Sequence, residues 1–131
     1  MLRNLILIFS SLFFIAPVFA RQKAPVVKLL SKASHSFGTY PEKKPKTCVF
    51  IVRNDGNAPL VFLKAETSCG CTSVTVNRRA VLPGQKGYIK VVYDGNGFIP
   101  GSFRKQISVY TNAAPRRIQL EISGYYFPKD E

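Results

Sequence analysis

Beyond residue 34, short runs rich in Val, Ile, Phe and Tyr alternate with breaks of Gly, Pro and Asn. This pattern predicts strands over residues 35–40, 46–53, 60–67, 72–76, 87–93, 103–111 and 117–126. In the sixth run, Ile107 and Val109 alternate with Gln106 and Ser108, which is typical of an antiparallel strand with one buried and one solvated face. No helical period follows residue 20, so we predict an all-β antiparallel sandwich of about seven strands.

The second predicted strand differs from the others because it is apolar at every position from Cys48 to Val52. A strand of this kind is expected in the middle of a sheet. It ends at residues 54–57, Asn-Asp-Gly-Asn, a strong turn sequence because Gly and Asn tolerate positive φ. We therefore expect a hairpin between the second and third strands.

The first twenty residues have the three parts of a secretory signal peptide. Arg3 supplies the positive start, residues 5–16 form the apolar run, and Val18 and Ala20 occupy the −3 and −1 positions of the cleavage site. We predict cleavage between Ala20 and Arg21. The apolar run is shorter than the roughly 20 residues of a membrane-spanning helix, so we expect no transmembrane span after cleavage.

Removal of the signal leaves 131 − 20 = 111 residues, enough for one domain. We divide them into a basic leader (residues 21–34), a sandwich domain (35–127) and a short polar tail (128–131). Of the 19 Lys and Arg residues only Arg3 is lost, so 18 cations face 7 acidic residues and the net charge becomes +11. Such a balance favours anionic partners.

Several short motifs follow one another in a specific order along the chain. They are residues 35–39 (HSFGT), 50–60 (FIVRNDGNAPL), 68–72 (SCGCT), 82–84 (LPG), 91–94 (VVYD), 101–105 (GSFRK) and 110–112 (YTN), with Gly124 near the end. In this order they resemble a bacterial family of exported domains of unknown function, over nearly the whole chain after the signal. The resemblance implies an immunoglobulin-like sandwich, similar to Hydin-type and major-sperm-protein-like domains. Those relatives are mostly interaction modules, so the resemblance implies no enzyme activity.

The three cysteines, Cys48, Cys69 and Cys71, leave several alternatives open because export permits disulfides. In the structural alternative, Cys48 is bridged to one member of the Cys69/Cys71 pair, or is a small buried residue. In the redox alternative, Cys69 and Cys71 close a small, readily reduced disulfide that supports thiol exchange. In the third alternative the same two thiolates hold a soft metal ion. His35 is the only histidine and no Met follows the signal, so four ligands would require the fold to gather His35 with all three cysteines, and we predict no metal and no cofactor.

No catalytic set can be assembled from the sequence. His35 is the only histidine and lies in the first predicted strand, and no Gly-rich phosphate loop leads from a strand into a helix. We therefore expect a protein that is not an enzyme. Nucleic acid is not an expected partner, because the protein is exported and has no recognised binding fold for it.

Our leading hypothesis is an exported sandwich that binds another component of the cell envelope. The first strand or an exposed edge would make the contact with an envelope protein. Alternatively, the basic surface binds an anionic envelope glycan, and the pairs Arg78-Arg79 and Arg116-Arg117 are the candidates for it. We expect the protein in the periplasm, with the cell surface or the outside as the alternatives.

Overall fold

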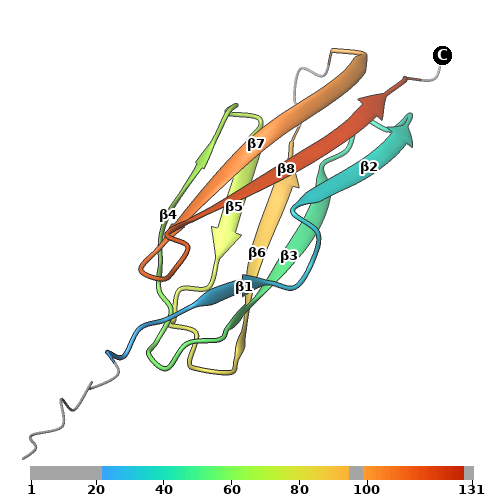
Figure 1. The fold of residues 1–131 in the computed structure, drawn as a ribbon. Helices are drawn as coiled ribbons and strands as arrows, with labels where there is room; N and C mark the ends of the chain where they lie inside the picture. Colours follow the sequence, from blue (N-terminus) through green and yellow to red (C-terminus); the bar gives the residue numbers. More distant parts are fainter. Residues whose placement is uncertain (1–21, 95–98, 129–131) are drawn as a thin grey trace, which may run out of the picture.

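The computed structural model describes residues 22–94 and 99–128, and these contain eight strands and no helix (Figure 1). The predicted signal peptide, with its cleavage site between Ala20 and Arg21, lies outside the described residues, as do residues 129–131 of the predicted tail. The strands are β1 (Val27–Leu29), β2 (Ser34–Tyr40), β3 (Lys46–Asn54), β4 (Phe62–Thr67), β5 (Thr72–Val76), β6 (Lys86–Tyr93), β7 (Gly101–Thr111) and β8 (Arg117–Tyr126). No helix in the described part of the chain is long and apolar enough to cross a membrane.

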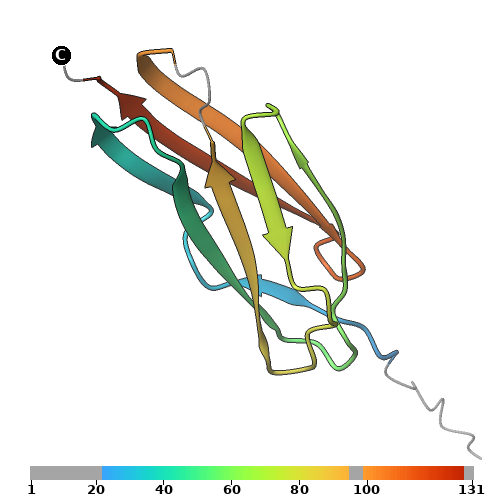
Figure 2. The same ribbon diagram turned by 180° about the vertical axis from the view of Figure 1, so that it is seen from behind.

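The strands form two sheets that pack face to face (Figure 1, Figure 2). The strand order is β1-β3-β6-β5 in the first sheet and β2-β8-β7-β4 in the second. The alternation seen in the sequence is confirmed, because Ile107 and Val109 of β7 are fully buried. They belong to one core cluster with Phe50 of β3 and Ile89 of β6, so both sheets contribute their apolar faces to it.

The predicted seven strands are all present, and the structure adds an eighth. Residues 21–34 were expected to be a basic leader, yet they contain β1, whose Val27 is 6% exposed and belongs to the core cluster. β1 pairs with β3 in the first sheet, and the chain then crosses to the second sheet as β2. There β2 runs parallel to β8, so the second sheet is mixed, which corrects the expectation of a purely antiparallel sandwich.

The prediction that the second strand is central is confirmed, since β3 lies between β1 and β6. Only one of its faces is buried, however. Cys48, Phe50 and Val52 point into the core, whereas Val49 on the opposite face is 47% exposed. The continuous apolar run therefore leaves apolar side chains on the outside of the first sheet.

The predicted hairpin at residues 54–57 is wrong, because β3 and β4 belong to different sheets. The turn instead forms hydrogen bonds with the N-terminal segment. The Asp55 N–H donates to the Val26 carbonyl at 2.7 Å, and Asn57 exchanges hydrogen bonds with Ala24 through its backbone N–H and its side-chain oxygen. Gly56 permits this approach, since a Cβ there would collide with the Ala24 and Val26 backbone. A turn sequence fixes local geometry but not the sheet that follows it.

Candidate functional site

The Cys-Gly-Cys turn forms the corner at which the chain passes from β4 in the second sheet to β5 in the first. Cys69 and Cys71 are joined by a disulfide, with their Cα atoms 5.3 Å apart. Both residues are half-buried, and Cys71 packs against the core cluster. The turn is therefore partly open to solvent on one side and attached to the core on the other.

Hydrogen bonds on both sides of the disulfide hold this corner. The Thr67 hydroxyl donates to the Cys69 carbonyl at 2.8 Å, and the Thr72 N–H donates to the same carbonyl at 3.3 Å. Towards the end of β6, the Asp94 N–H donates to the Cys71 carbonyl at 2.8 Å. Because these bonds bracket the turn, they fix the position at which β5 begins.

Cys48 is separate from this corner. It lies on β3 opposite Val91 of β6, whereas β5, which follows Cys71, lies on the other side of β6. Cys48 is a free thiol, and burial raises its pKa from the ordinary value of 9.0 to about 11. The sequence left open which cysteines are joined. In the structure, Cys69 is joined to Cys71, and Cys48 is a small buried residue outside the disulfide.

The geometry does not assemble a metal centre among the described residues. No group of three or more His, Cys, Asp or Glu side chains lies close enough there to hold a metal ion. The one histidine, His35, is on β2 in the second sheet, where its ring packs edge-on against Phe37 at 4.9 Å between centroids. With the sulfur atoms joined to each other, Cys69 and Cys71 are not thiolate ligands in this state.

Four strands lie at the ends of the two sheets, and three of them are blunted. β1 is only three residues long, β2 has an irregular register between Ser36 and Thr39, and β4 has one between Phe62 and Lys64. β4 also carries the Lys64–Glu66 ion pair. β5 has none of these features, because its sequence is Thr-Ser-Val-Thr-Val and its register with β6 is regular throughout.

The backbone of β5 offers unpaired groups on its outer side. The Cys71 carbonyl bonds towards β6, so the groups of Ser73 and Thr75 also point towards β6 by the alternation of an antiparallel ladder. The backbone groups of Val74 and Val76 consequently point away from β6, on the side where no further strand pairs with β5 among residues 22–94 and 99–128. An exposed edge was expected from the sequence as a contact, but β5 was not identified as that edge, although its uncharged run directly after the cysteine turn was a visible signal.

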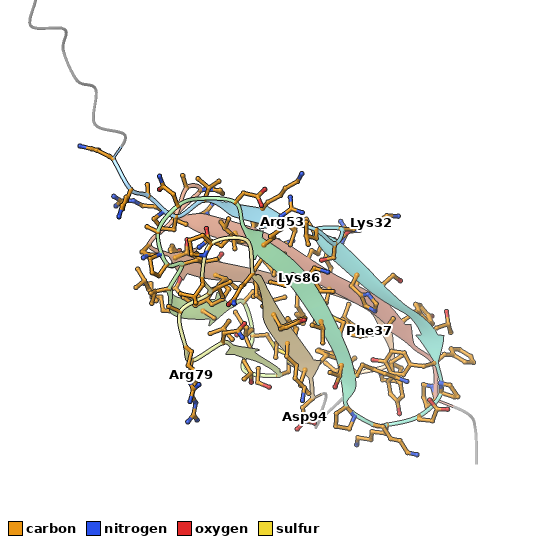
Figure 3. All side chains as sticks on the ribbon, turned by 90° about the horizontal axis from the view of Figure 1, so that it is seen from below. Lys32, Phe37, Arg53, Arg79, Lys86 and Asp94 are labelled. Carbon is orange, nitrogen blue, oxygen red and sulfur yellow. A yellow bond between two sulfur atoms is a disulfide. The ribbon has the colours of Figure 1, made fainter. Side chains whose placement is uncertain are left out.

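The predicted arginine pairs lie at the other end of the sandwich from the disulfide corner (Figure 1). Arg78 and Arg79 are in the connection from β5 to β6, and Arg116 and Arg117 are at the turn from β7 to β8. All four are exposed. Figure 3 shows Arg79 projecting away from the ribbon. The two pairs share one end of the domain, but the disulfide is not part of that surface.

Arg116 also lines a hollow of about 620 Å³ beside β4. The other side chains around it include Leu63, Lys64 and Tyr110. The Lys64 ammonium lies 4.7 Å from the centre of the Tyr110 ring and also pairs with Glu66, so its charge is already engaged. Arg116 is thus the remaining cation at the rim of this hollow.

The sandwich matches a known protein family by sequence. Residues 29–126, from the end of β1 to the end of β8, match the family described as protein of unknown function, DUF1573. The chain belongs to the DUF1573 family. The expected membership in a family of unknown function is thereby confirmed, while the likeness to Hydin-type and major-sperm-protein-like domains stays a prediction. None of the curated proteins matches this sequence.

Solved structures show what the DUF1573 fold resembles. A protein of unknown function from Porphyromonas gingivalis W83 is 16% identical with a TM-score of 0.67, over 83% of this chain and 50% of that one. The ASH / PapD-like domain 7 of human CEP192 is 10% identical with a TM-score of 0.61, over 92% and 98% of the two chains. The periplasmic chaperone SfaE is 16% identical with a TM-score of 0.53, over 79% and 58%.

These likenesses concern the fold of the DUF1573 domain, because all three identities are low. The immunoglobulin-like, PapD-like sandwich is confirmed by them. The chain spans half the length of the Porphyromonas gingivalis structure and 58% of SfaE, so it corresponds to a part of each.

Proposed function

We propose that this DUF1573 domain is a non-catalytic interaction module that binds an extended segment of a partner protein along the outer edge of β5. The observation that carries the proposal is the unprotected edge of β5, with its regular register and five uncharged residues. An edge of this kind offers a row of backbone groups to which another strand can add. The likeness to a protein named as a chaperone, SfaE, supports a protein partner.

The side chains of β5 define the chemistry of that segment. Val74 and Val76 are half-buried on the core side, whereas Ser73 and Thr75 are exposed on the outer side. A strand added beside β5 would alternate in the same way. We therefore expect an extended segment with apolar residues at every second position and no charged residue on its inward face.

A photo-crosslinking experiment tests the location of the contact. A photoreactive amino acid is placed at Ser73 on β5 or at Ser36 on β2, both of which are exposed. Irradiation of living cells should give a crosslinked partner from position 73, and mass spectrometry should map the crosslink to an extended segment. Crosslinks from position 36 alone would assign the contact to β2, the first strand predicted from the sequence, and would overturn the proposal.

A lysine substitution on β5 tests whether this edge binds the partner. Thr75→Lys adds a lysine to the exposed edge of β5 and should abolish the crosslink from position 73, because charge on an edge opposes strand addition. Thr47→Lys adds the same charge to the outer face of the same sheet, on β3, and should leave the crosslink intact. Equal yields from both variants would exclude β5 as the binding edge.

We propose the cell envelope, and the periplasm in particular, as the site of this interaction. The predicted signal peptide supports this location, as does the likeness to a chaperone described as periplasmic. Cell fractionation tests it, with N-terminal sequencing of the recovered protein. We expect a periplasmic protein that begins at Arg21, and recovery of the full-length chain from the cytosol would contradict the proposal.

The half-exposed disulfide favours thiol–disulfide exchange as a second candidate function. A dithiol partner would give two electrons and two protons to the Cys69–Cys71 disulfide through a mixed disulfide, leaving two thiols here and a disulfide in the partner. In the reverse direction, the single thiol left at Cys71 by Cys69→Ser, or at Cys69 by Cys71→Ser, would attack the disulfide of the oxidised partner. This step forms the mixed disulfide, releases one thiol in the partner and should trap the complex. Cys48→Ser is the control, because the buried Cys48 should trap nothing. Absence of any trapped partner would exclude this candidate.

A further inference from the structure

Three cations stand in one row across the outer face of the first sheet. Lys28 of β1 lies directly opposite Arg53 of β3, and Arg53 lies directly opposite Lys86 of β6. Their neighbours in each strand are buried on the other face, so all three side chains point outward. Figure 3 labels Arg53 and Lys86 near each other on the side of the domain that carries β3. Like charges directly opposite each other repel, and Asp55 beside Arg53 offsets only part of this repulsion.

The row continues into an apolar strip on the same face. Ile51 lies opposite Tyr88, and Val49 lies opposite a further cation, Lys90. Val49 and Tyr88 are 47% and 48% exposed, and no described strand covers them. The face therefore has an apolar centre with cations on both sides of it.

Little negative charge on this face balances the cations. Asp55 pairs with Arg53, and this hydrogen bond lowers the pKa of Asp55, with the charge of Lys28 lowering it further. Lys86 and Lys90 have no acidic residue opposite them, since their partners across the sheet are Arg53, Val49 and Thr75. No acidic side chain in the described part of the chain engages the cations of β6, so they can bind an external anion.

We propose that the outer face of β1, β3 and β6 binds the headgroups of an anionic phospholipid surface. Phosphate groups would neutralise the row from Lys28 to Lys86, and the exposed Val49 and Tyr88 would enter the boundary between headgroups and acyl chains. A soluble polyanion such as a polysaccharide would use the cations but would leave the apolar centre in water. The face adjoins β5, where Thr75 lies opposite Lys90, but it includes neither the backbone edge of β5 nor the arginine pairs at the end of the sandwich.

Co-sedimentation with vesicles tests this surface, using protein purified from the cells that produce it. We expect binding to vesicles that contain phosphatidylglycerol, weakening as salt rises, and no binding to pure phosphatidylcholine. Lys86→Gln with Lys90→Gln should weaken binding by about 25-fold, or about fivefold for each cation removed. Arg78→Gln with Arg79→Gln removes the same charge from a connecting loop and should change binding by less than about twofold, because that loop is off the face.

The remaining outcomes each decide the proposal. Tyr88→Ser should weaken vesicle binding without changing its dependence on salt, because it removes apolar contact and no charge. Equal losses of vesicle binding in the two double variants would show that binding depends only on the net charge of the protein, and would overturn the proposal. Binding to soluble dextran sulfate or polyphosphate without binding to vesicles would assign the face to a soluble polyanion and would also overturn it.

Discussion

The side-chain amide of Asn54 donates a hydrogen bond to the carbonyl oxygen of Val81 at 2.8 Å, across 27 residues of sequence. The same amide donates to the Ala58 carbonyl at 2.7 Å, and its oxygen accepts the Gly56 and Val26 N–H groups. Asn54 is completely buried. One side chain thus joins the end of β3, the connection to β4, the connection before β6 and the N-terminal segment.

Replacement of Asn54 by Ala should destabilise the fold strongly. It removes four hydrogen bonds, one of them buried and three part-buried, and although the Val81 carbonyl keeps the Leu60 N–H as a donor, each group left unsatisfied costs about 1–3 kcal/mol. Since some of these groups can reach water, we expect the free energy of unfolding to fall by about 2–4 kcal/mol, measured by urea denaturation. Asn57→Ala is the control, because Asn57 is exposed and should cost less than about 1 kcal/mol. Similar losses in both variants would show that Asn54 has no special role.

Replacement of Gly56 by Ala should detach the N-terminal segment. The new Cβ would collide with the backbone of Ala24, Pro25 and Val26, which cannot move without breaking their hydrogen bonds. We expect a loss of about 1–3 kcal/mol and faster proteolysis near residue 24. Gly70→Ala is the matched control, because a Cβ at Gly70 meets nothing within 4 Å. Unchanged protection of residues 22–26 in Gly56→Ala would contradict the close packing.

The Cys69–Cys71 disulfide should contribute little to stability. It closes a very short loop, because the two cysteines are 2 positions apart in the sequence. A disulfide stabilises less when its loop is shorter, so removing it with Cys69→Ser/Cys71→Ser should cost about 1–2 kcal/mol. Denaturation of the wild type with and without reductant should give the same difference. A loss far above this range would mean that the disulfide holds more of the structure than its own corner.

Cys48 should make the fold less stable at high pH. Its pKa is about 11 in the folded protein against an ordinary value of 9.0, so the unfolded chain loses this proton first as pH rises. The stabilising contribution is complete below pH 9.0 and is lost between pH 9.0 and about 11. The free energy of unfolding, measured by denaturation at each pH in this range, should fall more steeply with pH for the wild type than for Cys48→Ala. The variant is the control for tyrosine ionisation, which affects both proteins. Equal slopes would show that the Cys48 thiol titrates normally.

The strands could be predicted because the alternation of apolar and polar residues that identifies a strand is contained within its own sequence. The alternation at Ile107 and Val109 identified both the strand and its buried face without any knowledge of its neighbours. β1 was missed because it is three residues long and lies in a mixed basic segment, where only its partner β3 shows that it is a strand. The hairpin predicted at residues 54–57 failed for a related reason, since the next strand, β4, belongs to the opposite sheet of the sandwich.

The candidate surfaces could be predicted only in part. Cys69 and Cys71 drew attention to the right corner, because a Cys-Gly-Cys turn is visible in the sequence. The row of Lys28, Arg53 and Lys86 was hidden, because its members are far apart in the chain and meet only through the register of three strands. The unpaired edge of β5 likewise depends on the order of strands, which no local pattern encodes.

The parallel pairing of β2 with β8 sets the moment at which this sandwich can close. Ser34 to Tyr40 find their strand partners only at Glu121 to Tyr126, close to the opposite end of the chain. A chain that emerges N-terminus first, from a ribosome or through a membrane pore, must therefore hold β2 without its partner until residues 121–126 have appeared. Contacts of such long range form slowly. The topology itself delays completion of the second sheet until β8 is available.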